Sequence, residues 1–174
     1  ISYRREGGDM LAHILYERLT QKGYSVFQDI EILRSGKFNT AIYERIEQCK
    51  DVILILPPNS LDRCFDEEDW VRKEIICAIE NKKNIIPVML RGFSWPSEMP
   101  EEIYEIQFHN GLVANTEYFE QFLEKLIDFL VTSNPVKEKN NIKQKHIIRS
   151  ITMVIIILFI LLLPVIVIYI FRQP

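Results

Sequence analysis

Two apolar patterns alternate along the first 132 residues of this chain. In the first pattern, the runs 51–56 and 84–90 are apolar throughout after their first residues, Asp51 and Asn84, and the pair Pro57-Pro58 stops the earlier run. Continuous runs of this length fit strands of a parallel sheet that is buried on both faces. Pro87 then needs an unpaired side within its strand. Shorter strands are predicted at the front of the chain, at 24–27 and at 106–113.

In the second pattern, apolar residues recur every three or four positions, as they do on one face of a helix. Leu11, Leu15 and Leu19 belong to such a face, and Gly23 ends that helix. Strands that alternate with helices predict an α/β fold with a central parallel sheet flanked by helices. Ligands of such sheets bind beyond the carboxyl ends of the strands. Further helices are predicted at 38–46, 66–81 and 119–130.

The last part of the chain has a different composition. Residues 151–171 are almost all Ile, Leu, Val, Phe and Met, and no charged residue lies between Arg149 and Arg172. About 20 apolar residues are enough to cross a bilayer as a helix. The alternative, a buried core helix of this length without a polar face, is rare. We therefore predict one transmembrane helix at 147–171.

The residues beside this run predict its orientation. Several lysines precede it and only Arg172 follows it, so the positive-inside rule places the N-terminal domain in the cytoplasm. The sequence thus predicts a single-pass membrane protein, with the lipid bilayer as one partner. The expected parts are a globular domain at 1–132, a polar basic linker at 133–146, the membrane helix at 147–171 and a short tail at 172–174.

Composition and charge argue against several functional classes. The net charge is -3 and no long basic face is visible, so a nucleic-acid partner is not expected. The three cysteines share no CxxC spacing, which indicates neither a zinc site nor a disulfide framework. Neither a GxGxxG nor a Walker pattern occurs, so dinucleotide cofactor binding of the Rossmann type is not indicated. We expect no metal and no cofactor.

Two pairs of residues carry candidate chemistry. Trp70 and Glu74 are four positions apart on a predicted helix and therefore share one side of it. An aromatic plate beside a carboxylate suits a flat cationic ring attached to a sugar, and Arg4 and Arg5 suit phosphates. Spacing alone leaves plainer alternatives open: a solvated glutamate paired with a neighbouring basic residue, a tryptophan in the core, and two surface arginines.

Several separate motifs together resemble one known family. The chain resembles a TIR (Toll/interleukin-receptor) domain of the NAD-cleaving branch, and is similar to bacterial TIR proteins and to the animal NADase that drives axon degeneration. The resemblance implies a flavodoxin-like fold and covers nearly the whole globular part, with the apolar tail outside it. The matching motifs, in chain order, are ISYRRE, GYSVFQDIEILRSGKF, PNSLDRC, DWVRKEI, KNIIPVML and FSWP.

This resemblance implies a role for individual residues. Glu74 matches the catalytic glutamate of the family. In the family the site is composite, so an aromatic such as Trp95 could serve the pocket of a neighbouring domain. The short, acidic segment between Cys64 and Trp70 departs from the family pattern. The implied substrate-binding residues are Tyr3, Arg4, Arg5, Phe38, Trp70 and Trp95. The implied assembly loop, which docks on another TIR domain, contains Asp29, Glu31, Leu33, Gly36 and Lys37.

The resemblance and the chemistry together predict an NAD+ glycohydrolase. Because the nicotinamide nitrogen of NAD+ is already cationic, the ring leaves as a neutral group and one carboxylate can suffice, whereas ordinary glycosidases use two. The products expected are nicotinamide and ADP-ribose, or a cyclic ADP-ribose. Activation by clustering at the membrane would suit a bacterial immune or cell-death effector in antiviral defence. The main alternative is a non-catalytic TIR adaptor; a signal-producing cyclase and a nucleoside deoxyribosyltransferase-like enzyme are further ones.

Overall fold

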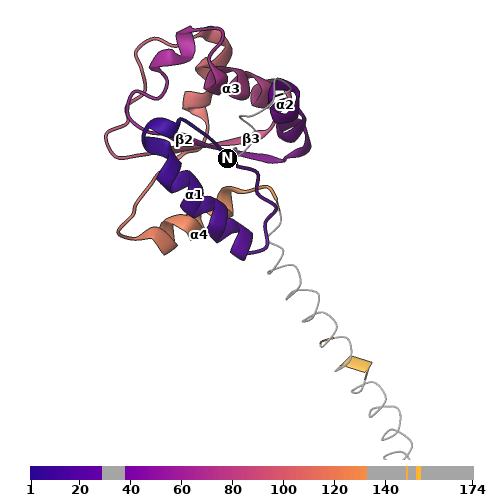
Figure 1. Ribbon diagram of the computed structural model, residues 1–174. Coiled ribbons are helices and arrows are strands. Elements are labelled where there is room, and N and C mark those ends of the chain that lie inside the picture. Colours follow the sequence, from indigo (N-terminus) through magenta and orange to yellow (C-terminus); the bar gives the residue numbers. More distant parts are fainter. Residues whose placement is uncertain (29–37, 133–147, 149–151, 154–174) are drawn as a thin grey trace, which may run out of the picture. The chain divides into compact units, whose positions relative to one another are not determined.

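The computed structural model describes residues 1–28, 38–132, 148 and 152–153 (Figure 1). The chain divides into two units, Ile1–Asn134 and Pro135–Pro174, and every element named below belongs to the first. The expected assembly loop at 29–37 lies outside the described residues, and so does most of the expected linker.

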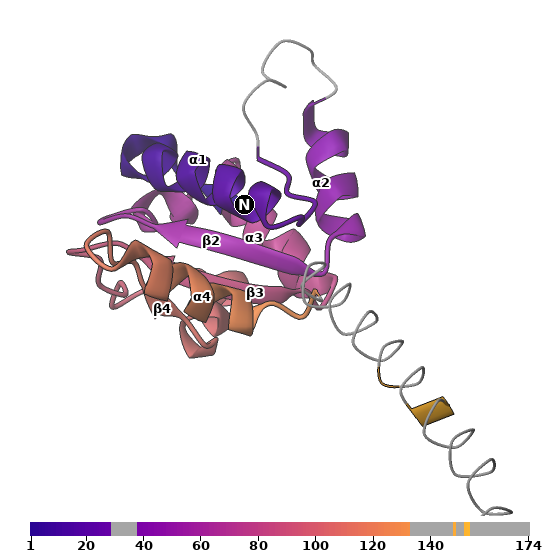
Figure 2. The ribbon, with the colours of Figure 1, turned by 90° about the horizontal axis from the view of Figure 1, so that it is seen from below.

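Four parallel strands form one sheet in the order β1-β2-β3-β4. β2 (Asp51–Leu56) and β3 (Asn84–Met89) are its two central strands and pair along their whole length. Figure 2 shows β2 beside β3, with its arrowhead at the left of the domain. β1 (Ser2–Tyr3) and β4 (Leu112–Val113) are shorter and flank this pair. The two continuous apolar runs are therefore buried parallel strands, as predicted, and the structure places them at the centre of the sheet with β1 at its edge.

Side chains of the central strands alternate between two apolar clusters, one on each face of the sheet. The first cluster joins the sheet to α1 (Arg5–Gln21) and α4 (Phe119–Phe129). The second joins it to α2 (Phe38–Gln48) and α3 (Trp70–Glu80). In Figure 1, α1 and α4 lie below the strands and α2 and α3 lie above them. The predicted α/β fold, a parallel sheet with helices on both faces, is confirmed.

The ends of the helices follow local signals in the sequence. α1 ends at Gln21, and Gly23 after it has a φ of +87°, a left-handed conformation that glycine adopts without steric strain. α4 buries a single stripe of its surface, as its spacing predicted. That stripe consists of Phe122, Leu123, Leu126 and Ile127.

Two predicted strands differ in the structure. Tyr24 to Phe27 is not a strand. Ile1 donates to the Phe27 carbonyl at 2.7 Å, but the segment forms no ladder with β1. The segment predicted at 106–113 begins inside the 3-10 helix η3 (Glu101–Phe108), and only Leu112–Val113 forms a strand. β4 pairs with β3 from Val88 onward, so Pro87 lies outside that ladder, in agreement with the expected unpaired side.

The expected membrane localisation is corrected by the structure. Among residues 1–28, 38–132, 148 and 152–153, no helix is both long and apolar enough to cross a bilayer. The longest described helix, α1, has 17 residues and carries many exposed polar side chains, whereas a span needs about 20 apolar residues. The single-pass prediction is therefore wrong by this finding, and no membrane side is assigned to the domain. The predicted helix at 147–171 lies almost entirely outside the described residues.

Candidate active site

Glu74 lies in the second turn of α3 and reaches β1, the strand at the edge of the sheet. The Ser2 hydroxyl of β1 donates a hydrogen bond to Glu74 Oε2. Ser2 is buried and Glu74 is half-buried. The serine therefore holds the carboxylate against the strand while part of the glutamate side chain stays accessible.

A cavity of about 620 Å³ borders this pair. Ser2 and Glu74 line it together with Arg45 of α2 and Phe27, which precedes the loop at 29–37. Its volume falls within the range of small-molecule pockets, about 300–1,000 Å³. The strand residues that line the cavity are Ser2 and the amino half of β2, so it lies away from the carboxyl edge at which the topology predicts ligands.

Trp70 is the first residue of α3, one helical turn before Glu74. This spacing places both residues on one side of the helix, as predicted. Trp70 is 37% exposed, and Lys73 Nζ lies 5.4 Å from the centre of its ring. Glu68 binds the same ammonium at 2.5 Å, and this hydrogen bond raises the pKa of Lys73. An accessible indole with a cation over it thus lies one helical turn before Glu74, outside the set of residues that line the cavity.

Asp69 determines where α3 begins. Its backbone is extended, and its Oδ1 accepts a hydrogen bond from the Arg72 N–H at 2.9 Å, which is the geometry of an N-cap. The sequence predicted a helix that begins near Asp66. In the structure the helix begins at Trp70. The Arg72 guanidinium in turn binds Glu102 of η3 at 3.0 Å, which ties the first turn of α3 to a second neighbour.

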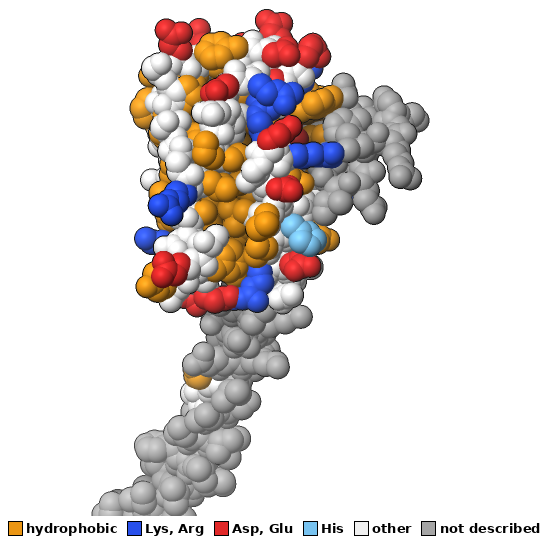
Figure 3. Space-filling model, turned by 60° about the vertical axis from the view of Figure 1, so that its left-hand side comes forward, with side chains coloured by type: hydrophobic (Ala, Val, Ile, Leu, Met, Phe, Trp, Pro, Cys, Tyr) orange, Lys and Arg blue, Asp and Glu red, His pale blue; other side chains and the backbone are white. Residues whose placement is uncertain are grey.

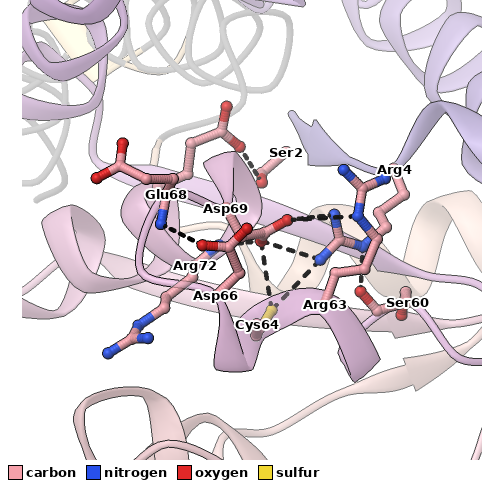
Figure 4. A network of polar contacts seen from close by, with 10 residues as sticks. Ser2, Arg4, Ser60, Arg63, Cys64, Asp66, Glu68, Asp69 and Arg72 are labelled. Atoms are coloured by element: carbon pink, nitrogen blue, oxygen red, sulfur yellow. Dashed lines mark hydrogen bonds and ion pairs between the residues drawn. The ribbon is translucent and has the colours of Figure 1, made fainter.

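Arg4 follows β1 directly and is buried in a network of polar contacts (Figure 4). Its Nη1 and Nη2 donate to the two carboxylate oxygens of Asp69 at 2.7 and 2.9 Å. Its Nε donates to the Ser60 carbonyl, and Nη2 lies 3.5 Å from Cys64 Sγ. All three guanidinium nitrogens are thus engaged with protein atoms, in a paired fork that is among the stronger hydrogen-bonding geometries.

The charges of this network hold one another in place. Burial opposes both charges, but the contacts between Arg4 and Asp69 outweigh it, so the pKa of Arg4 is raised and the pKa of Asp69 is lowered. Burial and the nearby Asp69 charge raise the pKa of the Cys64 thiol to about 12. Cys64 therefore remains a neutral thiol and donates to Asp69 Oδ1, 3.6 Å from its sulfur.

The other two residues of the front motif lie apart from this network. Tyr3 packs against the apolar cluster on the α1 side of the sheet, and Gln28 Nε2 donates to its hydroxyl at 3.5 Å. Because side chains of a strand alternate, Tyr3 and Arg4 point to opposite faces. Arg5 is the first residue of α1 and is exposed. The motif thus supplies one buried cation and one accessible cation.

The two remaining predicted aromatics are placed to different extents. Phe38 is the first residue of α2, and its side chain lies outside the described part of the structure. Trp95 lies in the loop after β3 and packs edge-to-face on Phe93, with ring centres 5.1 Å apart. It is half-buried against the apolar cluster on the α2 and α3 side of the sheet. Their contacts with a nucleotide stay predictions.

Sequence patterns did not indicate Ser2 or Asp69 as parts of this site. Ser2 lies two residues before Arg4, and this strand spacing was the available signal that both point toward α3. Asp69 directly precedes an amphipathic run, which is a recognised N-cap signal. Neither signal reveals the partner, because Glu74 and Arg4 are distant in sequence from Ser2 and Asp69.

Figure 3 shows the side of the domain that faces left in Figure 1, toward which β2 points in Figure 2. Apolar side chains gather in the middle of this face, and acidic and basic side chains border them.

Comparison with known proteins gives consistent relatives. The chain is 37% identical over 156 residues to the NAD(+) hydrolase tir-1 of Caenorhabditis elegans, which is 83% of this chain and 16% of the relative. It is 38% identical to the NAD(+) hydrolase sarm1 of Drosophila melanogaster over 135 residues, 75% of this chain and 10% of the relative. It is 40% identical to the NAD(+) hydrolase SARM1 of Danio rerio over 135 residues, which is 75% of this chain and 19% of the relative. The chain thus spans less than a fifth of the length of these curated relatives.

The model of the family described as TIR domain matches residues 1–127. This range contains all four strands, the helices α1 to α3 and each described residue of the site around Glu74. Sequence match and fold agree over the same residues, and the chain belongs to the TIR domain family.

Proposed function

We propose that this TIR domain cleaves NAD+ between nicotinamide and ribose, with Glu74 as the catalytic residue. The observation that carries the proposal is the position of the Glu74 carboxylate, which Ser2 holds at the wall of a cavity, one helical turn from an accessible indole. The relatives named NAD(+) hydrolases support the same activity. NAD+ is the substrate of this reaction.

The reaction requires only one carboxylate. When the bond between the ribose carbon and the nicotinamide nitrogen breaks, the electron pair stays with the ring, which leaves neutral and needs no proton. The sugar then carries the positive charge, and the Glu74 carboxylate stabilises that charge as it develops. Water adds to the sugar carbon and releases a proton, which gives ADP-ribose. Attack by the adenine ring on the same carbon gives a cyclic ADP-ribose.

We assign the remaining binding roles by exposure and position. Trp70 stacks on the nicotinamide ring, because its indole is accessible and lies on the same side of α3 as Glu74. Arg5 contacts the phosphates, because its side chain is exposed beyond the carboxyl end of β1. Phe38 and Trp95 contact the rings of the nucleotide, and Tyr3 lines the site from β1.

A second TIR domain completes the site in this proposal. The loop at 29–37 follows Phe27, a residue that lines the cavity, so a domain docked on the loop would approach the substrate. Activity then rises with the local concentration of TIR domains, because assembly becomes an effectively intramolecular step. NAD+ loss on clustering suits an immune or cell-death effector.

The test compares nicotinamide release from NAD+ by the full chain and by Glu74→Gln. We expect the wild type to release nicotinamide and Glu74→Gln to be slower by about 10² or more, the size typical for removal of one electrostatic stabiliser. Glu80→Gln is the matched control, since Glu80 is exposed at the end of the same helix. Circular dichroism and thermal melting check that each variant is folded.

Two outcomes would change the conclusion. Equal turnover by wild type and folded Glu74→Gln rejects the assignment of the catalytic residue. Intact NAD+ at concentrations at which the wild type self-associates rejects the enzyme and favours the adaptor.

A further inference from the structure

We propose that Arg4 is a positioning residue, which orients α3 through Asp69, and that it does not bind the phosphates of the substrate. The inference revises the role that the family resemblance implies for Arg4. It rests on the proposed function for its kinetic readout, while its spectroscopic readout is independent of catalysis.

The burial and the contacts of Arg4 carry the first step. Arg4 is 8% exposed and Asp69 is 5% exposed, so the ion pair is almost completely removed from solvent. Nη1 and Nη2 bind both oxygens of Asp69, and Nε binds the Ser60 carbonyl. A phosphate could reach this guanidinium only by displacing these partners, which would leave the Asp69 carboxylate buried without its counter-charge.

The second step concerns Asp69, which has two functions. The Asp69 carboxylate binds the Arg4 guanidinium. Its Oδ1 atom also accepts the hydrogen bond from the Arg72 N–H that caps α3. The residue after β1 is thereby tied to the residue before α3. Any shift of the Arg4 side chain is transmitted to the first turn of α3, which contains Trp70.

The third step combines this contact with the one at Glu74. Ser2 of β1 binds Glu74 of α3. Arg4, the residue after β1, binds Asp69, the residue before α3. The strand and the helix are therefore joined at two points. Apolar packing and the Arg72–Glu102 contact already hold α3 on the domain, and the two directional contacts define where its first two turns lie against β1. The pair of contacts therefore sets the angle at which α3 presents Glu74 to the cavity and Trp70 one turn before it.

Arg4→Lys separates positioning from phosphate binding. Lysine keeps the charge and binds phosphate well as a point charge, but it cannot form the two-nitrogen fork with Asp69. We expect Arg4→Lys to lower kcat about tenfold or more while KM for NAD+ stays within about twofold. Arg63→Lys is the matched control, because Arg63 lies 4.0 Å from Asp69 Oδ2 but its side chain is 69% exposed. It is expected to keep the wild-type kcat.

Asp69→Asn provides a second, independent variant. Asparagine caps helices about as well as aspartate, so α3 can still begin at Trp70 although the charge is lost. Both variants break one contact, so the double variant should be no slower than the slower single variant. An Arg4→Lys variant with the kcat of the wild type, or a double variant with the full product of the two losses, overturns the proposal.

Tryptophan fluorescence tests the same claim without turnover. The chain has two tryptophans, so Trp95→Phe leaves Trp70 as the only tryptophan, and excitation at wavelengths that tyrosine does not absorb selects its emission. In that background Arg4→Lys and Asp69→Asn should shift the emission maximum and the acrylamide quenching of Trp70, and Arg63→Lys should not. Unchanged emission in both folded variants overturns the proposal. A wild-type chain without activity on NAD+ rejects the proposed function only, because this readout still decides the role of Arg4.

Discussion

Asp51, the first residue of β2, offers a stability test that is independent of catalysis. Its Oδ1 accepts hydrogen bonds from Asn84 Nδ2 at 2.7 Å and from the Val131 N–H at 2.8 Å. Its Oδ2 accepts from the N–H and the hydroxyl of Thr132, the former at 3.0 Å. One half-buried carboxylate thus connects the start of β2 to β3 and to the residues that follow α4.

Asp51→Asn tests the value of these contacts. Asparagine keeps one acceptor oxygen and turns an NH2 group toward donors that the second oxygen served, so about two hydrogen bonds are lost. A hydrogen bond to a charged group contributes about 1.5–3 kcal/mol. At the lower end of this range, two lost hydrogen bonds amount to about 3 kcal/mol. Because Asp51 is only half-buried, solvent screening reduces the expected loss to about 2 kcal/mol in the free energy of unfolding. For a domain of this size the melting temperature should then fall by about 6–10 °C.

The pH dependence gives the sign of the effect. Burial raises the pKa of Asp51, but the hydrogen bonds from Asn84, Thr132 and Val131 outweigh burial and leave the pKa below its ordinary value. A carboxylate with a lowered pKa in the folded state stabilises the fold above its unfolded pKa, about 3.9, and loses this contribution as the pH falls through the folded pKa. The difference between wild type and Asp51→Asn should be constant above about pH 5 and shrink below about pH 4.

Urea denaturation at several pH values measures this difference directly. Asp69, whose pKa is also lowered, titrates in both proteins and cancels in the comparison. Asp62→Asn is the control, because Asp62 is exposed, and a surface change of this kind alters stability by less than about 0.5 kcal/mol. A difference that stays constant down to pH 3, or a variant as stable as the wild type at pH 7, would refute the role of the Asp51 hydrogen bonds.

Two further changes test the site and the sheet. Ser2→Ala removes the donor to Glu74 Oε2, so kcat for nicotinamide release should fall about 5- to 30-fold at nearly constant KM. An unchanged kcat would show that the serine does not orient the carboxylate. Gly111→Ala would place a Cβ 2.9 Å from the Pro87 carbonyl oxygen, so β4 must move away from β3. The free energy of unfolding, measured in urea, should fall by about 1–3 kcal/mol. A variant as stable as the wild type would show that the strand shifts freely.

The apolar patterns correctly predicted those strands and helices whose buried residues follow the regular spacing of the element itself. The run at 51–56 is β2, and the run at 84–90 contains β3, because a strand covered on both faces needs apolar residues throughout. The stripe at 119–130 is α4 for the corresponding helical reason. Failures occurred where a partner decides the structure. Tyr24 to Phe27 has the residues of a strand, but it forms no ladder beside the start of β1, where Ile1 donates to the Phe27 carbonyl.

Sequence spacing by itself determined that Trp70 and Glu74 share one side of a helix, since the geometry of five consecutive helical residues needs no other part of the chain. Only the tertiary structure decided what those residues meet. Ser2 and Glu74 are 72 positions apart, and Arg4 and Asp69 are 65 apart. Whether an arginine faces a ligand or a buried carboxylate depends on how β1 packs against α3. That packing is a property of the folded sheet and its helices, because directional contacts between residues so far apart in sequence form only when the intervening strands and helices have folded.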